Sequence, residues 1–408
     1  MTTVASYRHA GSEARRTAAL RAVREHLAND PEPVRRVLCE ISTHRAAGYE
    51  IEAAIATLDG AQAEVDKYRP RQLDQLAVYM PSNVLLYSYV LYLLVPSLYS
   101  SRVAFRPSSR VGSQTARLHE ILAPVHGLPV DLTGVSQRAF LRDHVHSADA
   151  VIFTGAYHNA EQIRSQLFPG QLLLYFGGGV NPFVVHPGAD LAHTARDAVT
   201  IRVHNSGQDC LGPDLFCVHE DLMAGFTAAL LDELALLRYG SYDDPEADYG
   251  PLVYDGAMEE AIQFLARNRQ RIVHGGRVDL GESRMEPTIV VGEEVTARTQ
   301  VPEFFAPVFH VVPYRDPHRL AATLTTGQFT EKAMGSSVYG DAPELAAALS
   351  RRTTVTVNTS LLSIDDGNAP FGGHGRMANY VTDGHEMWAE PLLVSKAVAE
   401  HAPEAGAR

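Results

Sequence analysis

Cysteine and tryptophan are scarce in this sequence, whose 408 residues include three cysteines and one tryptophan. Cys39, Cys210 and Cys217 cannot build a framework of disulfides. None of them belongs to a Cys-x-x-Cys pair or to a His/Cys cluster with the spacing of zinc ligands. We therefore expect no metal site, and a chain adapted to the reducing cytoplasm.

Positive charge is scarce relative to negative charge. The chain has 35 Lys and Arg residues against 48 Asp and Glu residues, which gives a formal net charge of -13. Such a surplus of negative charge repels the phosphate backbone of nucleic acids. Nucleic acid is therefore not expected as a partner.

Long apolar runs are missing as well. The most apolar stretch, Val84 to Val95, covers 12 residues between Pro81 and Pro96, whereas a membrane-spanning helix needs about 20. The N-terminal segment MTTVASYRHAGSEARRTAAL contains no apolar region of the kind found in secretory signals. We expect Val84–Val95 to form a buried helix, and we expect no membrane association.

The residue pattern changes along the chain. Residues 14–66 repeat Ala, Leu, Ile, Val, Glu and Arg at three- and four-residue spacing, which predicts consecutive helices. From Arg102 onward, short β-branched runs alternate with helical segments, which is typical of βαβ units and a parallel sheet. A second α/β unit begins near His204. The fold class is therefore α/β, and the length favours two or three lobes.

Two strand ends lead directly into helices, at residues 106–110 and 153–163. Backbone N–H groups at such turns attract the phosphates of nucleotides. Neither Gly-x-Gly-x-x-Gly nor Gly-x-x-x-x-Gly-Lys-Ser/Thr follows a strand, so the residues alone indicate a nucleotide only weakly. The glycine run at 177–182 is interpreted as a tight turn rather than a phosphate cradle.

Cys210 is the strongest candidate for chemistry. It lies in HNSGQDC, where Asn and Gly permit a tight approach of the backbone and the following strand would hold the thiol rigidly. The competing interpretation is a buried structural thiol. Cys39, on an amphipathic helix, and Cys217, within a strand, are interpreted as structural.

Fragments from about Arg15 to Lys396 resemble, in the right order, segments of the aldehyde dehydrogenase superfamily. YMPSNVLL is similar to its Pro-Trp-Asn loop, VAFRPSSR to its Lys-Pro-Ser-Glu strand end and VIFTGAYHNA to its Phe-Thr-Gly-Ser turn. FGGGVNPFVV resembles the Glu-Leu-Gly-Gly-Lys segment, and HNSGQDC resembles the Asn-x-Gly-Gln-x-Cys nucleophile motif. DYGPLV, EPTIVV, PEFFAPVFHVVPY, VTVNTS and APFGGHGR follow in family order.

The resemblance implies an α/β fold with a Rossmann-type cofactor domain, an α/β catalytic domain and a short C-terminal bridging arm. It assigns residues 1–203 to N-terminal helices and the dinucleotide-binding domain, 204–385 to the catalytic domain and 386–408 to an oligomerisation arm. EPLLVSKAVAE in this arm is similar to the strand that bridges subunits, whereas much of the hairpin before the MPSN loop is missing. We expect a homodimer.

By the same resemblance, Cys210 attacks a carbonyl carbon as a thiolate and forms a thioester. The side-chain amide of Asn83 and the backbone N–H of Cys210 would stabilise the oxyanion. Asn83 has a competing interpretation as the N-cap of a helix before Val84. The expected pocket residues are Tyr87, Tyr89, Leu211 and residues 360–364.

The resemblance also implies NAD or NADP as the cofactor. Glu303 matches the family Glu that binds the nicotinamide ribose, and an exposed loop carboxylate is the competing interpretation. Arg106 and Ser109 replace the Lys and Glu that hold the adenine ribose, and a guanidinium without that carboxylate suits the 2′-phosphate of NADP. The other residues expected at the cofactor are Thr154, Gly155 and Phe305.

One departure from the family pattern concerns the general base. Phe176 stands where the family Glu activates the water that hydrolyses the thioester, and an aromatic ring cannot accept that proton. Branches of the superfamily without this Glu transfer acyl groups to coenzyme A or phosphate, or reduce activated acyl groups to aldehydes. The candidates for a substitute base are His204, Asp209, Glu386 and Glu390.

Three functions stay open. The first is an NAD(P)-dependent aldehyde dehydrogenase-type oxidoreductase that interconverts an aldehyde and an acyl group through Cys210, with reduction of an acyl-CoA or carrier-bound thioester included. The second is an ordinary aldehyde-to-carboxylate dehydrogenase with a relocated base. The third is a catalytically impaired homologue that acts as a binding partner, against which the retention of Cys210, Asn83 and Glu303 argues.

Overall fold

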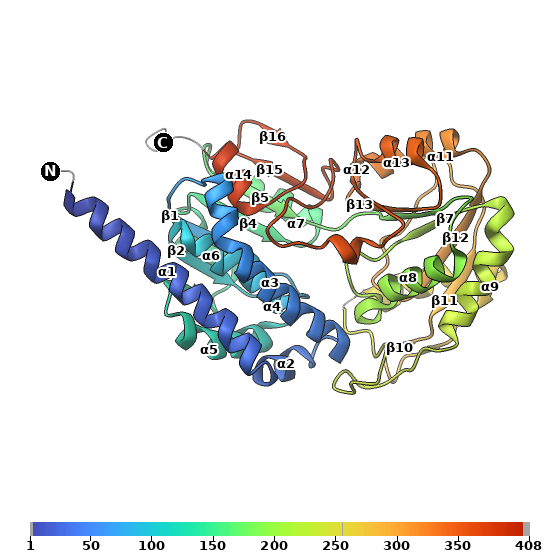
Figure 1. Ribbon diagram of the computed structural model, residues 1–408, viewed down its shortest axis with the longest axis horizontal. Coiled ribbons are helices and arrows are strands. Elements are labelled where there is room, and N and C mark those ends of the chain that lie inside the picture. The colour runs from blue at the N-terminus through green and yellow to red at the C-terminus, as the bar shows by residue number, and fades with distance from the viewer. Residues whose placement is uncertain (1–2, 255, 403–408) are drawn as a thin grey trace.

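The computed structural model describes residues 3–254 and 256–402. Its two large sheets, each of seven strands, lie in the two halves of an elongated molecule, with helices packed on them (Figure 1). Separate hydrophobic cores form against the two sheets. None of the helices in these residues is long and apolar enough to cross a membrane.

The first sheet lies in the half that holds the N-terminus. Its strand order is β3-β2-β1-β4-β5-β15-β16, in which β1 to β5 are parallel and β15 and β16 are antiparallel. The order β3-β2-β1-β4-β5 is that of a Rossmann-type nucleotide-binding unit, as expected. The strands are β1 (Leu73–Tyr79), β2 (Ser100–Arg106), β3 (Val130–Leu132), β4 (Ala150–Thr154), β5 (Leu172–Phe176), β15 (Asn379–Thr382) and β16 (Met387–Trp388).

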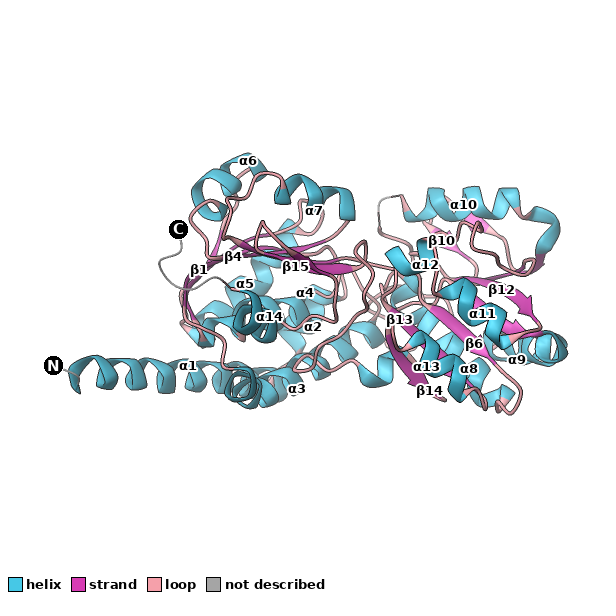
Figure 2. Ribbon diagram, turned by 90° about the horizontal axis from the view of Figure 1, so that it is seen from above, coloured by secondary structure: helices cyan, strands magenta, loops and turns pink. Residues whose placement is uncertain are grey.

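Helices cover both faces of the first sheet: α6 and α7 lie on one face, and α4, α5 and α14 lie on the other (Figure 2). The predicted N-terminal helices are present as three segments, because Pro31 precedes α2 and the Thr43 side chain caps α3 by accepting the N–H of Ala46. The helices are α1 (Thr3–Asn29), α2 (Glu32–Leu38), α3 (His44–Tyr68), α4 (Leu85–Tyr89), α5 (Gly112–His126), α6 (Gln137–Phe140), α7 (Tyr157–Arg164) and α14 (Val394–His401).

The second sheet has the order β14-β13-β6-β7-β12-β11-β8, and all of its neighbouring strands are parallel except β8 against β11. A short hairpin of β9 (Val278–Asp279) and β10 (Arg284–Met285) lies beside it. The strands are β6 (Pro182–Val185), β7 (Leu215–His219), β8 (Ile272–His274), β11 (Thr288–Val291), β12 (Val308–Tyr314), β13 (Gly335–Tyr339) and β14 (Thr354–Val357). The helices are α8 (Leu191–Val203), α9 (Met223–Leu234), α10 (Ala257–Arg267), α11 (Pro317–Leu324), α12 (Gln328–Glu331) and α13 (Pro343–Leu349).

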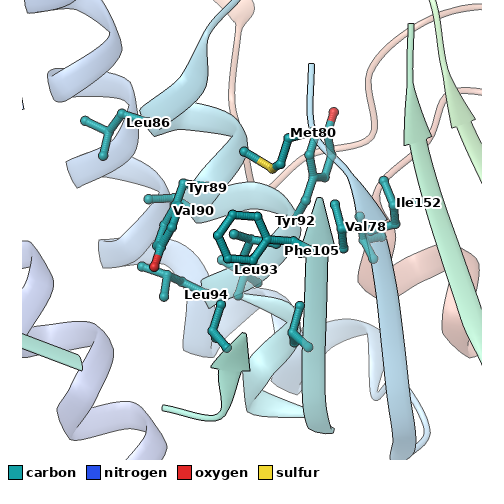
Figure 3. Close-up of a cluster of buried hydrophobic side chains, with 14 of the residues drawn as sticks. Val78, Met80, Leu86, Tyr89, Val90, Tyr92, Leu93, Leu94, Phe105 and Ile152 are labelled. Atoms are coloured by element: carbon teal, nitrogen blue, oxygen red, sulfur yellow. The ribbon is translucent and has the colours of Figure 1, made fainter. Parts of the chain in front are cut away.

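The apolar stretch Val84–Val95 forms a buried helix, as predicted. It consists of α4 and a π-helical turn over Val90–Leu94, and it packs against β1, β2 and β4 (Figure 3). Tyr89 is fully buried there, where its hydroxyl bonds His119 (2.7 Å) and His126 (3.0 Å). This helix fixes the loop before it, which carries the MPSN segment.

The division between the two sheets differs from the expected domain boundaries. β6 and α8 precede residue 204 but belong to the second half, and β15 and β16 return to the first sheet from the expected catalytic segment. The glycine run at 177–182 connects β5 to β6, and its glycines at 177–179 do not have the positive φ angles of many tight turns. The run is therefore a link between the sheets, and the prediction of a tight turn was wrong.

The C-terminal arm also differs from expectation. Val394–His401 forms α14, which packs on α3 and β5 of the same chain rather than extending as a strand. The reason lies in the spacing of Val394, Ala397 and Val398, which places these buried residues on one face of a helix. The prediction of a bridging strand over this segment was wrong, and residues 403–408 of the arm lie outside the described residues.

Candidate active site

A cavity of about 840 Å³ lies where the two halves meet, and residues from both halves line it. Residues at the carboxyl ends of β1, β2, β4 and β5 contribute to its wall, which is where open parallel sheets bind ligands. Every residue predicted for catalysis or cofactor binding lines this cavity: Asn83, Arg106, Ser109, Thr154, Gly155, Cys210, Glu303 and Phe305. The structure therefore brings together side chains that are more than 200 positions apart in sequence.

The loop between α8 and β7 carries Cys210, which is half-buried. Three successive residues in this loop, Asn205, Ser206 and Gly207, have positive φ angles of 48°, 61° and 81°. A Cβ atom at Gly207 would lie 2.5 Å from the carbonyl carbon of Ala306, so glycine is needed for the close approach of the two loops. The motif glycine thus packs the loop of the thiol against the loop that follows Glu303.

A buried ion pair joins the same two loops. Arg202, at the end of α8, is fully buried and lies 3.6 Å from Asp214. Its guanidinium donates hydrogen bonds to the carbonyls of Gly207 (2.5 Å) and Phe304 (2.8 Å). The carboxylate of Asp214 accepts the N–H of Phe304 at 2.6 Å. Both Nη atoms of Arg202 and both oxygens of Asp214 have partners, whereas the buried Nε of Arg202 has none among the described residues. The pair fixes the loop next to Glu303.

Asn181 fixes the backbone of Cys210 itself. Its side-chain Nδ2 donates to the Cys210 carbonyl at 2.6 Å and to the Gly212 carbonyl at 3.3 Å, while its Oδ1 accepts the N–H of Gly335 at 3.1 Å. These bonds hold the peptide that follows the thiol in one orientation.

The surroundings of the thiol are acidic. Burial raises the pKa of Cys210 well above its ordinary value, and the carboxylates of Asp209, Glu303 and Asp365 raise it further. These surroundings therefore favour the protonated thiol over the thiolate.

Asn83 lines the cavity immediately before α4. No side chain of the preceding residues caps this helix, and its N-terminal residue Val84 has φ 45°. The carboxylate of Glu50 on α3 takes that role instead, accepting the N–H groups of Leu86 (2.5 Å) and Tyr87 (3.1 Å). The N-cap interpretation of Asn83 was therefore wrong.

The end of the cavity near β1 and β2 is polar. The guanidinium of Arg106 is held by the carbonyls of Val135 (3.1 Å) and Pro107 (3.3 Å). Tyr79 lines the cavity with a buried hydroxyl that has no hydrogen-bond partner in the described part of the chain. Burial raises the pKa of Tyr79 to about 12, and the nearby charge of Arg106 acts in the opposite direction. An unsatisfied buried hydroxyl beside a fixed guanidinium fits a ligand with phosphate and hydroxyl groups, such as a pyridine dinucleotide.

Glu303 is half-buried in the cavity wall rather than exposed. A Cβ atom at Gly178 would overlap its Oε1 atom, so the carboxylate lies directly on the glycine link between the sheets. Burial, with a smaller contribution from Asp214, raises the pKa of Glu303 to about 8. A carboxyl group placed in this way can accept or donate hydrogen bonds to ligand hydroxyls.

Phe176, at the end of β5, lines the cavity where the family base was expected. Its ring packs against that of Tyr92, with centroids 5.1 Å apart. Of the candidate substitutes, Asp209 lines the cavity, whereas Glu386 and Glu390 do not, and Glu390 is paired with Lys396 and His401.

His204 lines a small adjoining cavity of about 30 Å³ rather than the large one. Burial lowers its pKa, so the imidazole is neutral.

No motif or spacing in the sequence indicates Asp365, which lines both cavities. Its carboxylate accepts hydrogen bonds from the hydroxyls of Tyr87 (3.1 Å) and Tyr49 (3.3 Å). Burial raises the pKa of Asp365 to about 6. It lies in the segment SIDDGN, between VTVNTS and APFGGHGR, which none of the family-like fragments includes.

The expected pocket residues are only partly confirmed. Tyr87 and Leu211 line the cavity. Tyr89 points into the core instead, where it bonds two histidines, and residues 360–364 do not line the large cavity.

The fold and the cavity define a class. A Rossmann-type sheet, a second α/β unit and a thiol with a neighbouring amide in the cavity between them are the features of a pyridine-nucleotide-dependent dehydrogenase that acts on carbonyl groups. The sequence model of the aldehyde dehydrogenase family matches residues 9–395, so the chain belongs to that family.

Three known proteins illustrate the similarity. The 4,4'-diapolycopene-4,4'-dial dehydrogenase of Cytobacillus firmus is 27% identical over 287 residues, covering 67% of this chain and 60% of that protein. Succinate-semialdehyde dehydrogenase [NADP(+)] 1 of Mycobacterium tuberculosis is 28% identical, covering 64% of this chain and 58% of that protein. This chain therefore aligns with less than two thirds of the length of either relative.

Among solved structures, glyceraldehyde-3-phosphate dehydrogenase GapN from Methanocaldococcus jannaschii, complexed with NADP, superimposes with a TM-score of 0.77. The sequence identity is 18%, and the match covers 96% of this chain and 88% of that one. At this identity, the similarity shows the shared fold.

Proposed function

We propose that this chain is an NAD(P)-dependent oxidoreductase that interconverts an aldehyde and an acyl group through a thioester on Cys210. The observation that carries the proposal is the single cavity lined by Cys210, Asn83 and all residues expected at the cofactor. The retention of these residues in one cavity also disfavours an impaired homologue that serves only as a binding partner. We further propose that it works in the cytoplasm on small molecules.

Cys210 and Asn83 carry the covalent chemistry in this proposal. The Cys210 thiol gives its proton to water or to a carboxylate of the cavity wall, its sulfur forms a bond to the carbonyl carbon, and the carbonyl electron pair moves onto the oxygen. The side-chain amide of Asn83 and the backbone N–H of Cys210 stabilise this oxyanion, and Asn181 holds the Cys210 peptide in place. Removing one donor of this kind costs about 10²–10³ in kcat.

The proposed cofactor is NADP or NAD, and when bound it accepts a hydride from the carbonyl carbon or returns one to it. Arg106 would hold the adenosine phosphate and Glu303 the hydroxyls of the nicotinamide ribose. The other residues proposed at the cofactor are Ser109, Thr154, Gly155 and Phe305. The hydroxyl of Tyr79, which has no hydrogen-bond partner among residues 3–254 and 256–402 and lies near Arg106, supports this direction of binding.

The proposed acyl acceptor is a thiol, such as that of coenzyme A or a carrier protein, rather than water. Phe176 supports this choice because it has no group that takes a proton from water. In the oxidative direction, aldehyde, thiol and NADP⁺ give thioester, NADPH and a proton. The second candidate is hydrolysis to the free acid, which is favoured by the presence of Asp209 and Asp365 in the cavity as alternative bases.

The test follows NADPH formation from NADP⁺ and an aldehyde, with and without coenzyme A, while mass spectrometry identifies the acyl product. We expect acyl-CoA to exceed free acid, and Cys210→Ser to lose at least 10³-fold in turnover with no acyl adduct on the protein. Cys39→Ser is the matched control, because this half-buried thiol lies outside the cavity. Turnover that survives Cys210→Ser overturns the assigned nucleophile, and free acid as the main product supports the second candidate.

A further inference from the structure

Several carboxylates line the same cavity as the thiol. Asp209 and Asp365 line the cavity together with Cys210 and Tyr87, and Asp366 follows at its exposed rim. The largest charges that act on the Cys210 thiol are those of three carboxylates: Asp209, Glu303 and Asp365.

Asp365 is held rigidly in this wall. Two tyrosine hydroxyls, those of Tyr87 and Tyr49, donate to its two carboxylate oxygens. A Cβ atom at Gly367 would overlap the side chain of Thr57 on α3, so the loop lies directly on that helix. The carboxylate of Asp365 is thus held in place in the wall of the cavity that also contains the thiol.

A second set of contacts holds the same loop against α3. Asn368 donates to the carboxylate of Glu64 at 2.8 Å, and a Cβ atom at Gly60 would overlap the Asn368 side chain. Two glycines, Gly60 and Gly367, therefore allow the loop and α3 to approach as closely as backbone permits.

The cationic side chains of the cavity wall lie elsewhere. Arg106 is bound to backbone carbonyls at the end of β2, and the charge of Lys332 acts on Glu303 and Asp214. Arg110 lies outside the lining residues, over the ring of Tyr254 at 5.1 Å. A carboxylate or phosphate on the substrate would therefore lie near like charges at Cys210, where the largest charges acting on the thiol are negative.

We propose that the cavity selects aldehydes and acyl groups whose chain is uncharged or positively charged, that it rejects those bearing a carboxylate, and that Asp365 is the residue that decides this selection. The inference rests on the proposed function. It separates this chain from its relatives that are named as succinate-semialdehyde dehydrogenases, whose substrate carries a carboxylate. In those enzymes the site must accept an anion, whereas here the fixed charge repels one.

The test compares three four-carbon substrates with NADP⁺: butanal, 4-aminobutanal and succinate semialdehyde. We expect kcat/KM for succinate semialdehyde to be at least about tenfold below that for butanal, and 4-aminobutanal to equal or exceed butanal. Asp365→Asn keeps an acceptor oxygen for one tyrosine. In this variant, the ratio of kcat/KM for succinate semialdehyde to kcat/KM for butanal should rise about tenfold. Asp366→Asn is the matched control, because it removes one charge from the next, exposed residue and should change the ratio less than about twofold.

The outcomes separate the inference from the proposed function. The inference is overturned if the unmodified protein turns over succinate semialdehyde as well as butanal. This comparison does not depend on how the variants fold. An unchanged ratio in a folded Asp365→Asn variant overturns the role of Asp365. A failure of all three substrates, with or without coenzyme A, overturns the proposed function and the inference together.

Discussion

At the scale of single residues, the proposed choice of a thiol rather than water as the acyl acceptor depends on Phe176, which lines the cavity. Replacing it with Glu supplies a carboxylate in the cavity, whereas replacing it with Gln supplies a side chain of the same size without a base. We expect Phe176→Glu, and not Phe176→Gln, to raise the ratio of free acid to acyl-CoA. Both variants lose the packing against Tyr92 and should be less stable by roughly 1–3 kcal/mol. Equal product ratios in the two variants would show that position 176 has no part in the choice of acceptor.

The buried carboxyl of Glu50 gives a prediction on stability. Burial raises its pKa from 4.5 to about 7, so the folded chain holds this proton more tightly than the unfolded chain does. The resulting stabilisation is complete below the unfolded pKa and is lost as the pH rises through about 7. Glu50→Gln keeps an acceptor oxygen for the N–H groups of Leu86 and Tyr87 and carries no charge.

We therefore expect the free energy of unfolding of Glu50→Gln, relative to that of the unmodified protein, to increase from pH 5 to pH 8 by on the order of 1–3 kcal/mol. Urea unfolding at the two pH values measures this difference. If the two proteins differ in free energy of unfolding by the same amount at pH 5 and pH 8, this result would falsify the raised pKa of Glu50.

At the scale of elements, the glycine link between the sheets positions Glu303. Gly178→Ala places a methyl group where Oε1 of Glu303 lies, so the carboxylate must move. We expect the KM for NADP⁺ to rise about tenfold with a smaller change in kcat, since binding rather than chemistry is altered. Gly134→Ala is the control, because a Cβ atom there meets no atom within 4 Å. Steady-state kinetics that are identical for the two variants would contradict a cofactor role for Glu303.

The elements themselves were largely predictable from local pattern, and the exceptions have physical reasons. The buried helix at Val84–Val95 and the parallel strands follow from apolar spacing and β-branched runs. The arm at Val394–His401 was expected to be a strand by resemblance, although its buried residues have helical spacing. The competing interpretation of Asn83 as a cap was wrong because the group that caps α4, Glu50, comes from another helix. Such a contact between distant segments has no local signal in the sequence.

At the scale of the whole molecule, the sequence predicted several residues of the candidate site, but it did not predict which other residues complete the cavity wall. Motif order identified Cys210, Asn83 and Glu303, and these side chains do line one cavity. Asp365 was missed because it reaches the cavity only through the packing of its loop on α3. The exchange of strands between the halves, with β6 in one sheet and β15 in the other, likewise depends on pairing at long range.

The homodimer stays a prediction at this scale. The strand on which it was based is the helix α14, packed on its own chain. Sedimentation equilibrium at several protein concentrations tests it: a mass near twice 44.5 kDa is expected. A mass of 44.5 kDa at all concentrations would show a monomer.

Ligand binding should stabilise the molecule as a whole, because the cavity is lined by both halves. NADP⁺ at about 100 times its Kd adds about 2.7 kcal/mol to the free energy of unfolding, which corresponds to a rise in apparent Tm of a few degrees. We expect NADP⁺ to raise the Tm at least as much as NAD⁺ at equal concentration, since Arg106 can pair with the extra phosphate and Ser109 does not repel it.

Arg106→Ala should reduce the shift caused by NADP⁺ to that caused by NAD⁺ or below it. Arg102→Ala is the control, since Arg102 lies on the same strand, pairs with Asp131 at 2.7 Å and does not line the cavity. Thermal unfolding of the three proteins with each dinucleotide gives the comparison. A larger shift with NAD⁺ than with NADP⁺ in the unmodified protein would remove the phosphate-binding role of Arg106, while the absence of any shift with either dinucleotide would mean that the cavity holds neither.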